Sequence, residues 1–283
     1  MAKEYYDSND IGEKIGLPGT GIIGIILGDQ LHPPMVDSTR IWRKGKRWKK
    51  GALLCTERLA KMARIRKLDH VLDVGSGVGG PAIFLAKKYG CKVTGLNSSE
   101  KQIETARKLT HERGLEHLVN YVEGDAQKMP FPSESFSCLW TFNMFYHIQD
   151  KQKAMEEFYR VLQQDGRLAF DDWMITKKAT SEDIKRLKWN WSSPPWATNE
   201  ELIDLIYSSS FTLQKWEDYS HVGKGVMAKY FSEVFERDIK PKIIEVDKER
   251  GNDMANDFKE DVEHIIELYK SNKLCYIQFV ATK

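Results

Sequence analysis

Residues 71–80 read Val-Leu-Asp-Val-Gly-Ser-Gly-Val-Gly-Gly, and this stretch decides the fold of the chain. A short apolar strand runs into a cluster of glycines, and a helical pattern follows it. Parallel α/β sheets present backbone N–H groups to a nucleotide by this succession of strand, glycine turn and helix. The stretch therefore predicts a strand–loop–helix unit that binds a nucleotide-containing ligand.

The glycine spacing by itself fits a dinucleotide loop, because Gly75, Gly77 and Gly80 match the pattern G-x-G-x-x-G. Asp73 favours another ligand, since a carboxylate two residues before the first glycine repels a diphosphate and attracts a cation. S-adenosylmethionine (SAM) carries an ammonium and a sulfonium and has no phosphate. We therefore expect SAM as the cofactor, held by Asp73, Gly75, Ser76 and Gly77.

Composition limits the class of protein. The 283 residues are long enough for one large α/β domain with an elaborated cap. Lys and Arg number 43 against 41 Asp and Glu, so the charge gives no case for nucleic acid as a partner. The four scattered cysteines show no zinc spacing, and we expect buried thiols and no metal. Without a signal peptide or a membrane span, we expect a cytoplasmic monomer or homodimer.

Strands and helices alternate along residues 70–175. The predicted strands are His70–Val74, Cys91–Leu96, Leu118–Val122, Phe136–Thr141 and Arg167–Asp171. Such regular alternation implies an α/β fold, namely a Rossmann-like, doubly wound, mostly parallel seven-stranded sheet with a helical lid. Sheets of this kind bind ligands beyond the carboxyl ends of their strands.

Flanking segments do not continue this alternation. The predicted segments are an N-terminal helical cap over 1–65, a SAM-binding core over 66–175, and a substrate lid over 176–283 that includes the last two strands. Those strands, Thr212–Trp216 and Leu274–Ala281, are expected to pair antiparallel at one edge. Charged helical segments at Lys224–Val246 and Met254–Lys270 are expected to form the lid.

Polar residues follow the second and third strands. Asn97 holds the position, about 20 residues after the glycines, where an acidic residue binds ribose hydroxyls. Gln102 adds a polar contact, although Asn97 also fits a turn or helix cap. After the third strand, Asp125 is placed to accept from the adenine amine, with Ala126 and Gln127 beside it. A plain surface loop is the alternative for these three residues.

The loop after the fourth strand, residues 140–147, is rich in aromatic side chains. We expect Asn143 to face the cofactor and Phe145 to contact the substrate, because aromatic faces stabilise a sulfonium or an amine. His147 is the candidate general base, since its ordinary pKa lies near neutrality, although a structural histidine is the alternative. In the lid, Trp173 and Trp191 indicate either an aromatic substrate pocket or lid packing.

Two charged segments each have more than one interpretation. The basic run Arg40–Lys50, which includes Trp42 and Trp48, is typical of a solvated face or of a site for a substrate anion. The pair Asp171 and Asp172 ends the fifth strand and could face a cation, but two carboxylates without a third ligand make a poor metal site.

The four motifs resemble class I SAM-dependent methyltransferases in order and spacing over roughly residues 65–175. Among small-molecule members, the chain most resembles sarcosine/dimethylglycine and phosphoethanolamine N-methyltransferases. The similarity includes the stretches Lys88–Val93 and Leu96–Glu100, the tyrosines Tyr5 and Tyr6, and the Gly28–His32 element. Tocopherol and prenyl or sterol C-methyltransferases share the same layout of the core.

The resemblance implies roles for residues outside the core. Tyr5 or Tyr6 would form a dyad with His147 that closes the site, and His32 would contact the substrate. Asn143 departs from the pattern, because the N-methyltransferases have Asp there and the C-methyltransferases commonly have Glu. An amide can neither neutralise a cationic amine nor take a proton from carbon, but it can bond a carbonyl, a hydroxyl or a neutral amine.

We therefore expect an enzyme that transfers a methyl group from SAM to a small-molecule acceptor, leaving S-adenosyl-L-homocysteine. The leading acceptor is the nitrogen of a small amine or amino acid, such as sarcosine, dimethylglycine or a phosphobase. The alternative is C- or O-methylation of a hydrophobic metabolite such as a prenyl compound, a phenol or a sterol-like molecule. A SAM-binding subunit without catalysis is a third hypothesis, and methylation of RNA is a fourth.

Overall fold

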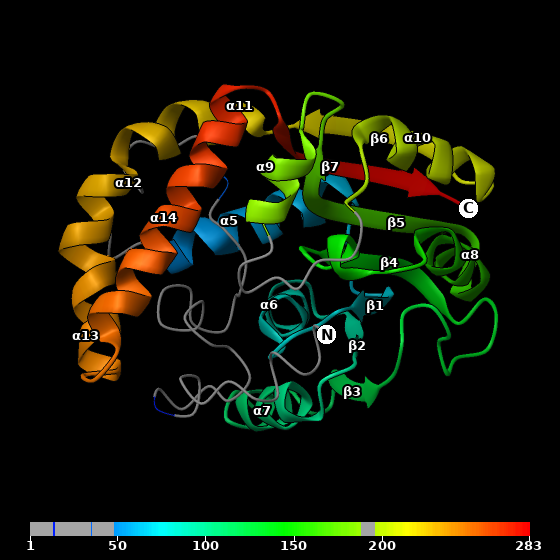
Figure 1. Cartoon of the computed structure of the whole chain (residues 1–283). Coiled ribbons are helices and arrows are strands. Elements are labelled where there is room, and N and C mark those ends of the chain that lie inside the picture. Colours follow the sequence, from blue (N-terminus) through cyan, green and yellow to red (C-terminus); the bar gives the residue numbers. More distant parts are fainter. Residues whose placement is uncertain (1–13, 15–34, 36–47, 188–195) are drawn as a thin grey trace.

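The computed structural model describes residue 14, residue 35, and residues 48–187 and 196–283. Its centre is a seven-stranded sheet in the order β3-β2-β1-β4-β5-β7-β6 (Figure 1). The strands are β1 His70–Val74, β2 Lys92–Asn97, β3 Val119–Glu123, β4 Phe136–Phe142, β5 Leu162–Ile175, β6 Thr212–Asp218 and β7 Leu274–Thr282. Strands β1 to β5 are parallel, and β7 lies antiparallel between β5 and β6. This confirms the predicted doubly wound, mostly parallel sheet and its antiparallel edge.

Helices connect and cover the strands. They are α5 Trp48–Met62, α6 Gly80–Tyr89, α7 Glu100–His111, α8 Lys151–Val161, α9 Ser181–Arg186, α10 Asn199–Ser208, α11 Ser220–Val222, α12 Ala228–Val234, α13 Lys240–Val246 and α14 Gly251–Lys270. A short 3₁₀ helix, η2, covers Phe145–His147, and π-helical turns lie at η3 Gly223–Met227 and η4 Phe235–Ile239.

Strand residues alternate between two hydrophobic clusters, because successive side chains of a strand point to opposite faces of the sheet. Cys138 and Trp140 of β4 join the cluster that contains side chains of α5, α6 and the lid. Leu139, between them, joins the cluster that contains side chains of α8 and α10. The sheet is therefore buried on both faces, as a parallel sheet requires.

Strand register decides where the loops meet. Val74, the last residue of β1, lies opposite Leu96 of β2 and Thr141 of β4. In turn, Leu96 lies opposite Val122 of β3. The parallel strands thus end at one edge of the sheet, and the loops that follow them come together there.

The lid departs from the sequence prediction in one respect. Residues 224–246 were expected to form one helical run, and they are helical throughout, but the turns η3 and η4 are π-helical rather than α-helical. Pro241 lies at the start of α13. Because proline has no backbone N–H, the regular α-helical hydrogen bonding cannot pass through it. Figure 1 shows α12, α13 and α14 together at one end of the molecule, beyond the sheet.

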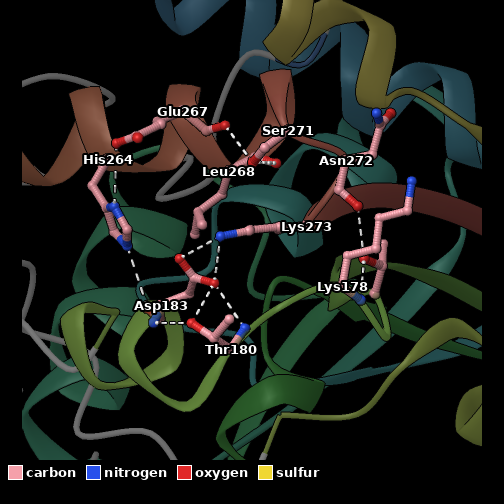
Figure 2. Close-up of polar contacts among 10 residues, drawn as sticks. Lys178, Thr180, Asp183, His264, Glu267, Leu268, Ser271, Asn272 and Lys273 are labelled. Atoms are coloured by element: carbon pink, nitrogen blue, oxygen red, sulfur yellow. Dashed lines mark hydrogen bonds and ion pairs between the residues drawn. The ribbon is translucent and has the colours of Figure 1, made fainter.

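A polar clasp fastens α9 to the lid and the sheet (Figure 2). Asp183 accepts from the backbone N–H of Thr180 at 2.7 Å and caps the start of α9. The Nζ of Lys273 lies 3.0 and 2.8 Å from the two carboxylate oxygens of Asp183. His264 of α14 approaches the backbone oxygen of Asp183 at 3.3 Å. The clasp therefore joins α9 to α14 and to the start of β7.

Removing the clasp by Asp183→Ala is expected to destabilise the protein by about 1 kcal/mol more than Glu201→Ala in α10 does. Glu201 forms the same capping box with Thr198, but within the described residues it has no ion pair. Lys273 and the N–H of Thr180 hold the pKa of Asp183 well below its ordinary value. Its contribution is therefore complete above pH 4 and is lost as the pH falls. Urea unfolding at pH 7 and pH 3 measures this difference, and equal losses at pH 7 would contradict it.

Candidate functional site

The glycine loop lies against the loop that follows β4. Gly75 and Gly77 have φ angles of 75° and 54°, in the left-handed region that favours glycine. The N–H groups of Gly75 and Ser76 donate to the backbone oxygen of Leu96 at 2.8 and 3.1 Å, which ties the loop to the end of β2. A Cβ atom at Gly75 would lie 2.1 Å from Cγ of Met144. Glycine is required at this position by both backbone conformation and close approach.

Asp73 is a buried acid with unused hydrogen-bonding capacity. Its residue is only 1% exposed, and its Oδ2 has no hydrogen-bond partner within the described ranges. Burial raises the pKa of Asp73 to about 7, and the N–H of Ala82 partly opposes the rise. The hydroxyl oxygen of Ser76 nearby in the loop is also buried without a partner among these residues. This end of β1 therefore favours a ligand that brings a positively charged donor.

The amide of Asn97 at the end of β2 is oriented by Gln102. Its Nδ2 donates to Oε1 of Gln102 at 2.7 Å. Ser99, rather than Asn97, caps α7, because its hydroxyl accepts from the N–H of Gln102 at 3.2 Å. Asn97 thus keeps its side-chain oxygen as an acceptor for a hydroxyl donor, which is the arrangement that a ribose needs.

The loop after β3 is folded onto itself next to Asn97. Gly124 donates its N–H to the backbone oxygen of Asn97 at 2.9 Å. The exposed carboxylate of Asp125 accepts from the backbone and side-chain nitrogens of Gln127 at 2.8 and 3.1 Å. The side-chain oxygen of Gln127 accepts from the backbone N–H of Asp150 at 2.9 Å, so Gln127 shapes the loop. Ala126 is half-buried against the cluster that contains α8.

Two acidic residues within β5, Asp171 and Asp172, position the aromatic loop that follows β4. Asp172 is fully buried, and its Oδ2 accepts from the backbone N–H groups of Met144, Phe145 and Tyr146, with the shortest distance, 2.6 Å, to Phe145. Asp171 accepts from the Nδ2 of Asn143 at 3.2 Å. The sequence interpretation of a cation-facing pair missed this role, because nothing local in the sequence shows that β5 lies beside this loop.

Burial raises the pKa of both carboxyls of this pair, to about 7 for Asp171 and about 8 for Asp172. Hydrogen bonds from Tyr276 and Gln278 oppose the rise at Asp171, whereas the charge of Asp171 adds to the rise at Asp172. Two buried acids, each with a raised pKa, therefore hold the residues at the end of β4 by hydrogen bonds.

Buried aromatic side chains pack together beside this loop. Tyr146 stacks on Trp196, with ring centroids 5.2 Å apart, and on Trp173 at 6.2 Å. Phe145 points the other way and is fully buried against Phe170 at 5.2 Å. Phe145, which was expected to contact the substrate, thus lies in the core against β5, whereas Tyr146 packs with the two tryptophans. The sequence around these two adjacent aromatic residues does not show which direction each side chain takes.

His147 closes the loop as the last residue of η2. Both ring nitrogens are enclosed, and its ring lies 4.0 Å from that of Tyr146. Burial, and then the charge of Lys151, lower the pKa of His147 to about 3. The imidazole is therefore neutral at physiological pH, and its protonation as a general base costs more than its ordinary pKa implies.

Replacing His147 by glutamine is expected to reduce the acid sensitivity of the fold. Because the folded pKa lies below the ordinary value of 6.5, stability is present above pH 6.5 and is lost as the pH falls toward 3. Between pH 7 and pH 4.5, the Tm of His147→Gln should therefore rise relative to that of the unmodified protein, in which His147 must stay neutral. His111→Gln, at an exposed histidine of α7, is the control. Identical pH profiles for the two variants would contradict this expectation.

Four of the proposed residues, Tyr5, Tyr6, His32 and Trp191, lie outside the described residues, as does most of the basic run 40–50. The structure does bring together the residues predicted in the loops after β1, β2, β3 and β4. Within the described part of the chain, no group of His, Cys, Asp and Glu is arranged to hold a metal ion. No helix in that part is long and apolar enough to cross a membrane.

Comparison with known proteins agrees with this geometry. Residues 72–170 match a methyltransferase domain. The chain is 33% identical over 175 residues to a sarcosine/dimethylglycine N-methyltransferase of Halorhodospira halochloris, covering 61% of this chain and 58% of that protein. It is 34% identical over 125 residues to a sterol 24-C-methyltransferase of Pneumocystis carinii, covering 44% of this chain and 33% of that protein. The chain spans less than two thirds of the length of these curated relatives.

The fold also matches a solved structure. A geranyl diphosphate C-methyltransferase from Streptomyces coelicolor superposes with a TM-score of 0.74, covering 99% of this chain and 96% of that one. The sequence identity is 13%, so the likeness concerns the fold alone. It extends over both the core and the lid.

Proposed function

We propose that this chain, whose residues 72–170 form a methyltransferase domain, transfers a methyl group from SAM to a small-molecule acceptor. The observation that carries the proposal is Asp73, a buried acid with an unused oxygen beside the glycine loop. A buried carboxylate without a partner is costly unless a cationic ligand completes it. The relatives named as methyltransferases support the same activity.

The residues around this loop fit SAM. The ammonium of SAM would donate to Asp73, and the backbone of Gly75, Ser76 and Gly77 would allow its close approach. Ribose hydroxyls would donate to Asn97, with Gln102 fixing that amide. The exposed carboxylate of Asp125 would accept from the adenine amine, although it also holds Gln127. Ala126 would line the adenine site.

The catalytic task of the protein is to orient and enclose the reactants. When bound, SAM supplies an activated methyl group on a sulfonium that loses its charge on transfer. A cation bound over the ring of Tyr146 or Trp173 would be stabilised by about 0.5–2 kcal/mol. Holding the acceptor in line with the methyl group contributes most of the remaining rate enhancement. His147, neutral at pH 7, would support the loop that carries Asn143 and Tyr146.

The leading acceptor is the nitrogen of a small amine or amino acid. Similarity to the sarcosine/dimethylglycine enzyme of Halorhodospira halochloris and the aromatic cluster beside Asn143 support it. Methylation of carbon or oxygen in a hydrophobic metabolite is the second candidate. The sterol 24-C-methyltransferase relative favours that candidate, and the stacked rings of Tyr146, Trp173 and Trp196 suit an apolar acceptor as well.

Mass spectrometry of a metabolite extract incubated with the protein and deuteromethyl-SAM tests this function. We expect a labelled methyl group on an amine. A label on carbon or oxygen would favour the second candidate. Binding of SAM by calorimetry without transfer to any metabolite would overturn the proposed enzymatic function and favour a non-catalytic subunit.

A further inference from the structure

We propose that a buried chain of hydrogen bonds fixes the amide of Asn143 so that its side-chain oxygen faces the methyl acceptor. The inference rests on the proposed function and narrows its substrate class. Acceptors would then be neutral groups that carry an N–H or O–H, which bonds to this oxygen. The residues that orient the amide are Arg58, Gln278, Asp171 and Tyr276, from α5, β7 and β5.

The chain of hydrogen bonds begins at a group that can only donate. Arg58 donates through Nε to Oε1 of Gln278 at 2.7 Å, and through a terminal nitrogen to the backbone oxygen of Met35 at 2.8 Å. Its guanidinium also lies over the ring of Tyr219, 3.3 Å from the centroid. Because a guanidinium has no acceptor, the amide of Gln278 must turn its oxygen toward Arg58.

This orientation decides the next contacts. The nitrogen of Gln278 donates to Oδ2 of Asp171, at 2.5 Å. The hydroxyl of Tyr276 donates to Oδ1 of the same carboxylate in a short hydrogen bond. The single proton of Tyr276 is therefore used, and its oxygen is left to accept. Asp171, Tyr276 and Gln278 are all fully buried, so water does not compete for these contacts.

Asn143 meets two acceptors. Its Nδ2 donates to Oδ1 of Asp171 at 3.2 Å and to the hydroxyl oxygen of Tyr276 at 2.9 Å. Its backbone N–H donates to the backbone oxygen of Asp171 at 2.8 Å. A flipped amide would bring its oxygen against the carboxylate. Because the Tyr276 hydroxyl is itself bonded to Oδ1 of Asp171, the two acceptors lie side by side and share one N–H of Asn143. The nitrogen is thereby fixed toward the protein interior, and Oδ1, on the other side of the amide, remains as the acceptor for a ligand.

The position of this oxygen makes it relevant to the acceptor. Asn143 has a φ of 50° and directly precedes Met144, which packs on Gly75 of the glycine loop. On the lid side, Trp173 lies edge to face with Tyr276, with ring centroids 6.3 Å apart. The oxygen thus belongs to the short stretch between the proposed SAM loop and the aromatic cluster of Tyr146, Trp173 and Trp196.

A carbonyl oxygen at this position selects methyl acceptors that can donate a hydrogen bond to it. A neutral secondary amine can donate its N–H to Asn143 while its lone pair stays free. The nitrogen then forms the new N–C bond as the C–S bond of the sulfonium breaks, and the sulfur keeps that electron pair. The resulting ammonium releases its proton to water after it leaves the site. A neutral tertiary amine has no N–H for Asn143, and neither has the carbon of an alkene.

Amide hydrogen exchange by NMR tests the orientation without any acceptor. In the full chain, the Nδ2 proton of Asn143 that faces Asp171 and Tyr276 should be protected, with Asn143→Asp used to assign the pair of protons. Tyr276→Phe should raise the exchange rate of that proton at least about tenfold. Tyr269→Phe removes a buried hydroxyl that has no partner within the described residues, and it should leave the exchange unchanged. An unprotected proton in the unmodified protein, or equal effects of the two variants, would overturn the proposed orientation.

Transfer from deuteromethyl-SAM to a metabolite extract tests the acceptor class. Each labelled methyl group should replace a hydrogen of an N–H or O–H, and a label on a former tertiary amine or on carbon would overturn the proposal. Asn143→Asp should lower transfer about 100-fold, because it sets a second carboxylate against Asp171. The double variant Asn143→Asp/Asp171→Asn restores one donor and one acceptor and should recover at least about tenfold.

The two proposals fail in different ways. If the protein does not bind SAM in calorimetry, the proposed function fails, whereas the exchange experiment still reports the orientation of Asn143. If SAM binds and methyl groups are transferred, but Asn143→Asp and Tyr276→Phe transfer them at the rate of Tyr269→Phe, the proposed role of Asn143 fails while the function stands.

Discussion

Replacing Asp73 by asparagine is expected to weaken SAM binding about 10- to 100-fold, because it removes a charge-assisted hydrogen bond to the ligand's ammonium. The substitution keeps the shape of the side chain. The carboxylate lies at the end of β1, only 1% exposed, with Oδ2 lacking a partner among the described residues. Isothermal titration calorimetry with SAM and with S-adenosyl-L-homocysteine, which retains the ammonium, measures the loss.

The same substitution is expected to stabilise the ligand-free protein at pH 8. Burial raises the pKa of Asp73 from 3.8 to about 7, so the folded state holds this proton more tightly than the unfolded state does. Stability is therefore present below pH 4 and is lost as the pH rises to 7. The cost above pH 7 is up to about 4 kcal/mol, and an uncharged amide avoids it. A higher Tm with weaker SAM binding is the expected combination.

Asp261→Asn in α14 is the matched control. Asp261 is also an acid whose pKa is raised to about 7, by burial and by the charges of Asp257 and Glu260. It lies in the lid helix and not in the glycine loop. We expect Asp261→Asn to raise the Tm at pH 8 and to leave the affinity for SAM unchanged. If Asp73→Asn binds SAM as well as Asp261→Asn does, Asp73 does not hold the ammonium.

Gly75→Ala is expected to abolish SAM binding and to destabilise the fold by at least about 3 kcal/mol. Two costs combine at this position. The φ of 75° costs a residue with a side chain about 1–2 kcal/mol. In addition, the new Cβ would lie 2.1 Å from Cγ of Met144, so the loop after β4 would have to move. That movement would displace Asn143 as well.

Gly114→Ala separates the two costs. Gly114 has a φ of 65°, but a Cβ there would meet nothing within 4 Å. We expect this control to lose only about 1–2 kcal/mol, from the backbone conformation, and to bind SAM normally. Chemical unfolding and calorimetry of both variants measure the difference. Equal destabilisation would show that the contact between Gly75 and Met144 contributes nothing.

Much of the fold could be predicted because its signals are local. Buried parallel strands read as short apolar runs, and glycine and polar residues mark their ends. Asp73, Asn97 and Asp125 were placed at one edge of the sheet from strand order alone, and the register of β1, β2 and β3 brings their loops together. The helical run over 224–246 was predicted as well, but its π-helical turn η4 was not, because residue spacing does not distinguish π-helical from α-helical hydrogen bonding.

Other features depended on contacts between distant segments. Asn143, Asp171 and Tyr276 are separated by 28 and 105 residues in sequence, yet they share hydrogen bonds. Likewise, the pKa of His147 is lowered by burial, which the sequence around it does not reveal. Phe145 and Tyr146 are adjacent aromatic residues, and only the direction of η2 decides which of the two core clusters each one joins.

The doubly wound sheet, the glycine loop and the expected preference for a cationic ligand at Asp73 could all be predicted from the sequence. Those features follow from hydrophobic period, backbone freedom and charge within a few residues. The tertiary structure alone decided how the end of β4 is held. Asp171 and Asp172 come from β5, Tyr276 and Gln278 from β7, and Arg58 from α5. Each of these residues fixes which atoms of the next one donate and which accept a hydrogen bond. Because the residues are far apart in sequence, this arrangement produces no periodic pattern along the chain.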